Sequence, residues 1–139
     1  MNPPNINQRP LSPHLSIYKQ EWTMRYSITH RFTGMGLSLG LAVFVCWLLA
    51  LSMGEAAYMM FTNCLASVPG RVILFLISFC YAYHFCNGIR HLFWDIGKGF
   101  ELQQAARSGH IMLGLSLITT IGFWVLAYLC QEGGFIYAG

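Results

Sequence analysis

Three long apolar segments, separated by shorter polar ones, dominate the hydrophobic pattern of the chain. Residues 32–53 and 111–130 contain no charged side chain, and residues 72–89 contain only His84 and Asn87 as strongly polar positions. Each segment has about 18–22 residues, the length that an α-helix needs to cross a hydrocarbon layer roughly 30 Å thick. Helices also satisfy their own backbone polar groups, which lipid cannot do. The pattern therefore predicts three transmembrane helices in an all-α membrane protein.

The composition agrees with this fold class. Of the 139 residues, 55% are hydrophobic and 9% are charged, and the mean hydropathy is +0.50. These values are typical of a membrane chain rather than a soluble domain. The formal net charge of +3 comes from basic connections and does not indicate a nucleic-acid surface. We therefore expect membrane lipid, and no nucleic acid, among the partners.

The pattern divides the chain into consecutive segments. We expect an N-terminal arm and interfacial segment (1–28), a first transmembrane helix (29–53), an outer connection (54–69), a second transmembrane helix (70–94), an inner connection (95–108), a third transmembrane helix (109–131) and an outer tail (132–139).

Basic residues indicate the orientation in the membrane. They are Arg9, Lys19, Arg25 and Arg31 on the arm, and Arg90, Lys98 and Arg107 around the inner connection. The outer connection has no Lys or Arg before Arg71, and the tail has none. By the positive-inside rule, the N-terminus is expected inside and the C-terminus outside.

The second span carries the first candidate site. His84, Gly88, His91 and Asp95 follow one another in steps of four, three and four residues, so they share one helix face. An ionisable side chain inside a span is a candidate functional group. Gly88, one turn after His84, leaves room for a flat group such as a haem on an imidazole ligand. A histidine packed against a neighbouring helix is the alternative explanation.

One straight helix cannot supply both axial ligands of one haem. His84 and His91 are seven residues apart, roughly 10 Å along the axis, whereas two axial nitrogens lie about 4 Å apart if each metal–nitrogen bond is about 2 Å. If His84 binds iron, the sixth ligand must come from elsewhere.

A second polar cluster precedes the first span. Ser27 and Arg31 are one helical turn apart, His30 is adjacent, and Gly34 removes side-chain bulk one turn after His30. The predicted topology brings this cluster level with Arg90 and His91 at the inner boundary, a rim suited to haem propionates or a quinone headgroup. A helix-cap hydroxyl equally explains Ser27. Arg31 and Arg90 could also be boundary anchors, and for Arg90 this is the favoured interpretation.

Other features carry less chemistry. The five cysteines show no CxxC or CxxCH spacing, so covalent haem attachment is not indicated, although Cys64 and Cys130 lie near one face and could pair. Gly36 and Gly40 form a GxxxG, which usually marks helix packing. In the third span, Thr119 and Thr120 are expected to bond back to their own helix, and His110 is interpreted as an ordinary polar residue.

Two motifs carry a resemblance to a known family. One is Ser12-Pro13-His14-Leu15 followed by Ser27-Ile28-Thr29-His30-Arg31-Phe32-Thr33-Gly34; the other is His84-xxx-Gly88-x-Arg90-His91-xxx-Asp95. With both motifs in order across the whole chain, the sequence resembles the cytochrome b556 subunits of succinate dehydrogenase, the larger membrane anchors of respiratory complex II.

The resemblance implies partners, cofactors and a location. Such a subunit pairs with a second small membrane anchor subunit and holds an iron–sulfur subunit and a flavoprotein subunit at the inner side of the membrane. One haem b lies between the two anchors, and ubiquinone is the substrate that receives electrons from the iron–sulfur subunit. The location implied is the bacterial cytoplasmic membrane or the mitochondrial inner membrane. Succinate chemistry belongs to the partners, so no catalytic residue for it is expected here.

The resemblance also implies residue roles. His84 matches the axial haem ligand, Ser27 and Arg31 match ubiquinone contacts, and His30 and Arg31 match residues near the haem propionates. Gly88 and His91 belong to the haem neighbourhood, whereas the roles of Arg90 and Asp95 stay open.

Two other functions remain as alternatives. One is the anchor of a quinol:fumarate reductase, which is the same architecture run in reverse. The other is a haem-free membrane scaffold of three helices. A transporter is disfavoured, because the sequence has no internal repeat and no pair of broken helices.

Overall fold

The computed structural model describes residues 21–132, which form four α-helices and no strand. The helices are α1 (Trp22–Ser52), α2 (Glu55–Ala66), α3 (Val68–Asp95) and α4 (Leu102–Glu132). Most of the expected N-terminal arm, including the motif at residues 12–15, and the tail after residue 132 lie outside the described residues.

Three of these helices confirm the predicted transmembrane architecture. α1, α3 and α4 contain 31, 28 and 31 residues, and all three are long and apolar enough to cross a membrane. α1 starts at Trp22, ahead of the expected start of the first span at residue 29, so Ser27, which was expected in the arm and interfacial segment, lies within the helix.

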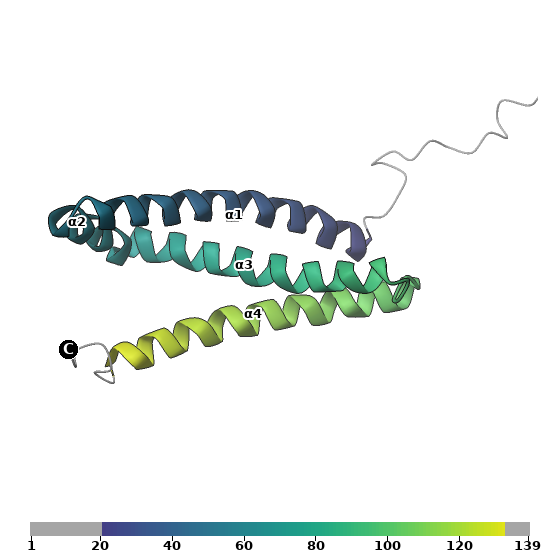
Figure 1. Ribbon diagram of the computed structural model, residues 1–139. Helices are drawn as coiled ribbons and strands as arrows, with labels where there is room; N and C mark the ends of the chain where they lie inside the picture. The colour runs from purple at the N-terminus through teal and green to yellow at the C-terminus, as the bar shows by residue number, and fades with distance from the viewer. Residues whose placement is uncertain (1–20, 133–139) are drawn as a thin grey trace, which may run out of the picture.

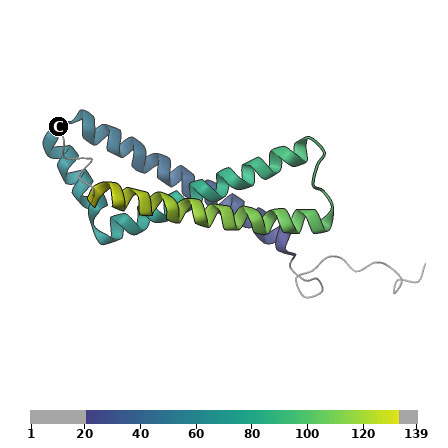
Figure 2. The same ribbon diagram turned by 90° about the horizontal axis from the view of Figure 1, so that it is seen from below.

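α3 packs against both α1 and α4 and runs in the direction opposite to both (Figure 1). Seen from below, α1 and α3 cross rather than lie parallel (Figure 2). One end of the bundle holds the start of α1, the end of α3 and the start of α4, while α2 lies at the opposite end. The polar clusters on α1 and α3 therefore meet at one end.

Small residues let α1 and α3 approach each other closely. A Cβ on Gly36 would lie 2.7 Å from Cys80 Sγ, and one on Gly40 would lie 2.8 Å from Ile77 Cγ2. Both separations are shorter than real contacts of this kind, so these positions require glycine at this helix spacing. The packing role predicted for the GxxxG is confirmed.

The connection between the first two spans contains a helix that the sequence analysis did not anticipate. Gly54 turns the chain with φ +100°, a conformation that favours glycine, and α2 follows. Ser67 then caps α3, since its hydroxyl accepts from the Gly70 amide at 3.3 Å. Gly70 is buried against the backbone of Cys64 and Leu65, which brings the two helices into a tight corner.

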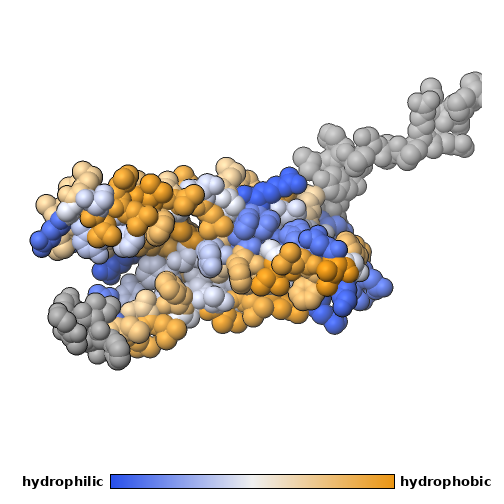
Figure 3. Space-filling model, in the orientation of Figure 1, coloured by the Kyte–Doolittle hydropathy of each residue, from blue (hydrophilic) through white to orange (hydrophobic). Residues whose placement is uncertain are grey.

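Most of the described surface is apolar. Tyr26, Tyr83 and Met112 form a small buried core, with Phe79, Cys86 and Leu113 packed against it. Apolar side chains cover large parts of the visible face, and hydrophilic ones gather near the start of α1 (Figure 3). Such a surface is suited to lipid or partner helices and not to water. Cys64 and Cys130 are exposed and free, so the possible disulfide is not formed.

Gly109→Ala is expected to destabilise the bundle, because a Cβ there would fall on the Tyr26 ring. Displacing this buried ring should cost about 1–3 kcal/mol and lower the thermal midpoint of the detergent-solubilised complex. Gly122→Ala on the same helix is the matched control, since the added Cβ meets no atom within 4 Å. Equal midpoints for the two variants would show that Tyr26 does not depend on Gly109.

Candidate functional site

Three histidine rings meet where α1 and α3 pack at the inner end expected from the sequence. His30 of α1 stacks on His84 of α3, with ring centroids 3.8 Å apart and planes 15° from parallel. The His30 ring also lies 5.3 Å from the His91 ring. Thus His30 lies between the two α3 imidazoles, although the sequence analysis placed it level with His91 only.

The hydrogen bonds of His84 define its tautomer. Its Nδ1 lies 3.2 Å from the His30 carbonyl oxygen and 3.3 Å from Thr33 Oγ1. A carbonyl can only accept, and the Thr33 hydroxyl already donates to the same oxygen at 2.8 Å. Nδ1 therefore carries the proton, and Nε2 keeps a lone pair that can bind a metal.

A histidine whose second nitrogen donates to a carbonyl is the usual arrangement of a metal-binding imidazole. The surroundings leave space for a cofactor: a Cβ on Gly88 would meet no atom within 4 Å. At Gly34, by contrast, a Cβ would lie 3.2 Å from His84 Cε1, so this glycine admits the ring itself. These features fit an iron porphyrin with His84 as one axial ligand.

A metal held by protein side chains alone does not fit the same region. In residues 21–132, no three His, Cys, Asp or Glu side chains are arranged to hold a metal ion. His30 Nδ1 is buried without a hydrogen-bond partner. Burying such a group costs free energy unless another molecule pairs with it.

Ser27 and Arg31 lie on an exposed face of α1, one turn apart. No side-chain hydrogen bond joins either of them to another residue between 21 and 132. Both thus lie beside His30 in the chain but form no hydrogen bond with the α3 histidines. Asp95, at the end of α3, is likewise exposed and has no ion-pair partner in this range.

The interpretation of Arg90 as a boundary anchor is wrong, because the side chain is only 7% exposed and points into the bundle. It donates to Ser108 Oγ at 2.9 Å, to Asn87 Oδ1 at 3.2 Å and to the Ala105 carbonyl at 2.7 Å. Its guanidinium also lies 4.2 Å from the centre of the Trp94 ring. Arg90 therefore joins α3 to α4 through neutral acceptors.

Sequence reasoning also missed a contact between α1 and α4. The Tyr26 hydroxyl and His110 Nδ1 are 2.7 Å apart, and the His110 ring meets the Trp22 ring edge-on at 5.4 Å. In the third span itself, Thr120 donates to the Ser116 carbonyl at 2.8 Å, which confirms the predicted bond to its own helix.

These features define a class of protein: a three-span helical membrane subunit with an imidazole cluster at one end of the bundle. The chain matches the family described as succinate dehydrogenase/fumarate reductase transmembrane subunit over residues 5–123. It therefore belongs to this family.

Named relatives cover most of the chain. It is 41% identical over 119 residues to the succinate dehydrogenase cytochrome b556 subunit of Rickettsia felis, covering 86% of this chain and 93% of that protein. The corresponding subunit of Rickettsia prowazekii is 40% identical over 119 residues, with the same coverage of 86% and 93%. The mitochondrial cytochrome b560 subunit of Homo sapiens is 38% identical over 118 residues, covering 84% of this chain and 70% of that protein. The chain is a multi-pass inner-membrane protein and a membrane anchor of complex II.

Arg90→Lys is expected to weaken the bundle, because an ammonium cannot reproduce the three directed bonds of the guanidinium. Leaving buried acceptors unpaired should cost about 1–3 kcal/mol, measured as a lower thermal midpoint of the purified complex. Arg107→Lys, at an exposed position on α4, should leave the midpoint unchanged. A midpoint unaffected by Arg90→Lys would show that the directed bonds of the guanidinium do not stabilise the bundle.

Proposed function

We propose that this chain is the cytochrome b anchor subunit of a succinate:quinone oxidoreductase. Together with a second small membrane anchor subunit, it holds the iron–sulfur and flavoprotein subunits at the inner side of the membrane. The N-terminus lies inside and the C-terminus outside, as the distribution of basic residues indicates. Succinate oxidation takes place on the partner subunits, and this chain helps to bind the quinone that receives the electrons.

The main observation behind this proposal is the hydrogen bonding of the His84 ring. Its Nδ1 donates to the His30 carbonyl, so Nε2 is available in an apolar stretch, residues 72–89, that contains no Lys, Arg, Asp, Glu or second His. A plain packing role for the imidazole would not require open space beside Gly88. The name cytochrome b556 of the relatives supports haem as the group that His84 binds.

The haem b is proposed to lie between this chain and the second anchor subunit. His84 would hold the iron through Nε2, and a second ligand would come from the partner subunit, because His84 and His91 lie too far apart along one helix to bind the same iron. The unpaired His30 Nδ1, with the His91 ring 5.3 Å from the His30 ring and Arg31 next in the chain, is suited to bind the propionates. When bound, the haem supplies a centre that can store one electron near the quinone.

Ser27 and Arg31 are proposed to bind the ubiquinone headgroup. Both are exposed on the same face of α1 and have no partner within residues 21–132, so both remain available to a ligand. Arg31 would stabilise the oxygen on which negative charge develops during reduction. Ser27 would donate a hydrogen bond to the headgroup or pass a proton to it.

The alternatives identified from the sequence receive less support. The family description includes fumarate reductase, but the named relatives are succinate dehydrogenase subunits, which favours the direction of succinate oxidation. A haem-free scaffold would leave His30 Nδ1 buried and unpaired without any compensating function.

His84→Ala is expected to abolish or shift the b-type signal in a reduced-minus-oxidised visible spectrum of the purified complex, because the imidazole ligand is lost. His84→Met keeps a ligand atom and should give an altered spectrum with haem retained. His110→Gln is the control. His110 lies on α4 and forms its hydrogen bond with Tyr26 of α1, so this variant should keep the spectrum of the parent. An unchanged spectrum in both His84 variants would remove His84 as the ligand.

Arg31→Leu is expected to lower succinate-dependent ubiquinone reduction roughly a hundredfold, because a donor to the developing oxyanion is removed. Ser27→Ala should lower the same rate. Both variants should keep the reduction of a soluble artificial acceptor, which takes electrons before the quinone site. Arg107→Leu is the control for loss of a cation at this end of the bundle. If both activities fell together in the Ser27 and Arg31 variants, these residues would serve assembly and not quinone binding.

A further inference from the structure

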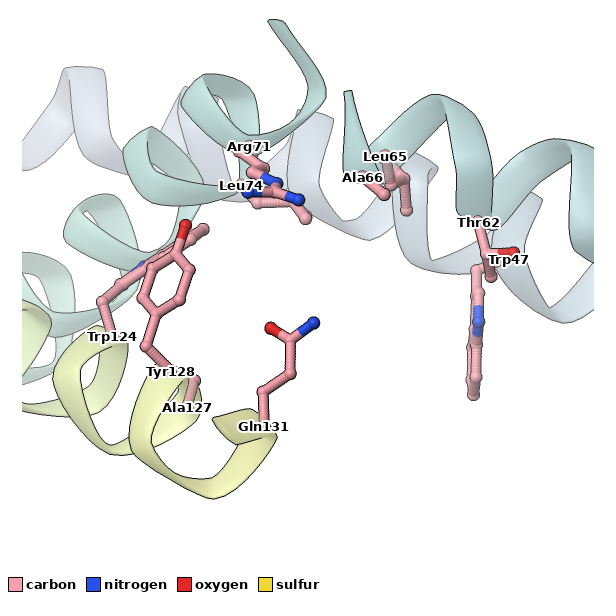
Figure 4. A pocket seen from close by; sticks show the side chains of 10 residues that line it. All are labelled: Trp47, Thr62, Leu65, Ala66, Arg71, Leu74, Trp124, Ala127, Tyr128 and Gln131. Carbon is pink, nitrogen blue, oxygen red and sulfur yellow. The ribbon is translucent and has the colours of Figure 1, made fainter. Parts of the chain in front are cut away.

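A hollow lies at the end of the bundle where α2 packs, opposite the histidine end (Figure 4). It has a volume of about 330 Å³ and is lined by residues from all four helices. Arg71 of α3 faces it, as do Tyr128 and Gln131 of α4. Trp47 of α1 and Thr62 of α2 lie on the other side of the hollow. The residues proposed to bind haem and quinone take no part in it.

Three polar groups around this hollow have no partner of their own. The Arg71 guanidinium, the Tyr128 hydroxyl and the Gln131 amide form no side-chain hydrogen bond or ion pair with the residues that the structure describes. Thr62 differs, because its hydroxyl donates to the Tyr58 carbonyl at 2.8 Å. A cation and two neutral hydrogen-bonding groups therefore face the same space, an arrangement that is suited to an anion with several oxygen atoms.

An apolar hollow of about 640 Å³ continues from the first toward the middle of the bundle. On each long helix, a residue that lines this apolar hollow lies one turn from a residue that lines the first hollow. The pairs are Phe44 and Trp47 on α1, Ser78 and Leu74 on α3, and Thr120 and Trp124 on α4. Trp124 Nε1 donates to Ser78 Oγ at 3.3 Å, so the two hollows adjoin. The two hollows, which lie end to end, are called the groove below: the hollow with Arg71 is its mouth, and the apolar hollow is its interior.

The charge that faces the hollow itself is positive. Arg71 is the one charged residue among the described residues that line it, although Glu55 and Glu132 lie at the same end of the bundle, at the start of α2 and the end of α4. Trp47, Trp124 and Tyr128 place indole and phenol groups around the mouth, as is typical of a membrane–water boundary.

We propose that this groove binds one anionic phospholipid. The phosphate lies at Arg71, with Tyr128 and Gln131 as further hydrogen-bonding groups, and one acyl chain follows the apolar hollow past Phe44 and Ser78. Such a lipid joins a negative headgroup to a long apolar chain, and the groove likewise has polar side chains at its mouth and apolar side chains in its interior. A quinone tail would fill only the apolar part and would leave the Arg71 charge without an anion.

Photo-crosslinking in the assembled complex tests the proposal. The complex is equilibrated with phosphatidylglycerol that carries a diazirine in one acyl chain, illuminated, and digested for peptide mass spectrometry. We expect label on peptides that contain Phe44 or Thr120, displaced by excess phosphatidylglycerol and not by phosphatidylcholine with the same chains. Arg71→Gln should lower this labelling roughly fivefold, as expected for one cation near a lipid headgroup. Arg71 is exposed, so the variant should assemble normally.

Arg107→Gln is the matched control, because it removes an exposed cation from the other end of α4. Labelling of the groove should be unchanged in that variant. Equal labelling by the phosphatidylcholine probe, with no effect of Arg71→Gln, would overturn the proposal in favour of unselective lipid. Displacement by ubiquinone alone would identify a quinone tail instead. Label absent from the groove, with crosslinks to a second subunit in its place, would identify a partner helix.

Discussion

The close contact of α1 with α3 is the constraint on which the candidate site depends. Gly34, Gly36 and Gly40 carry no side chain where His84, Cys80 and Ile77 approach. At this spacing the His30 carbonyl reaches His84 Nδ1, so the contact that packs the helices also pairs the imidazole. A histidine inside lipid needs such a partner. Helix packing and the chemistry of the site are therefore a single feature of the structure.

The sequence predicted those features that are encoded locally. Spans follow from runs of apolar residues, and the shared face of His84, Gly88 and His91 follows from helical periodicity. The partner of His84 was not predictable, because it is a backbone oxygen 54 positions away. The Tyr26–His110 bond joins residues 84 positions apart and has no signature in either segment.

Arg90 and α2 show two further ways in which local reasoning falls short. An arginine near a span boundary can extend to water or turn inward, and the choice depends on acceptors from α4 that its own helix does not reveal. α2 spans 12 residues, of which only one is charged, and so its segment resembles an extension of the neighbouring spans. Its direction is set by Gly54 and by the corner at Gly70, which are tertiary features.

The polar groups at the histidine end fall into two sets on opposite sides of α1. Tyr26 faces α4, where its hydroxyl is bonded to His110, and the Arg90 guanidinium is enclosed between α3 and α4. Ser27 and Arg31 lie roughly 100° and 140° around α1 from Tyr26, and they are exposed. The Tyr26 and Arg90 side chains are thus bonded on the α4 side, whereas Ser27 and Arg31 have no side-chain hydrogen bond within residues 21–132. In the proposed function, α4 supports the bundle, while the ligands and partner subunits approach the face formed by α1 and α3.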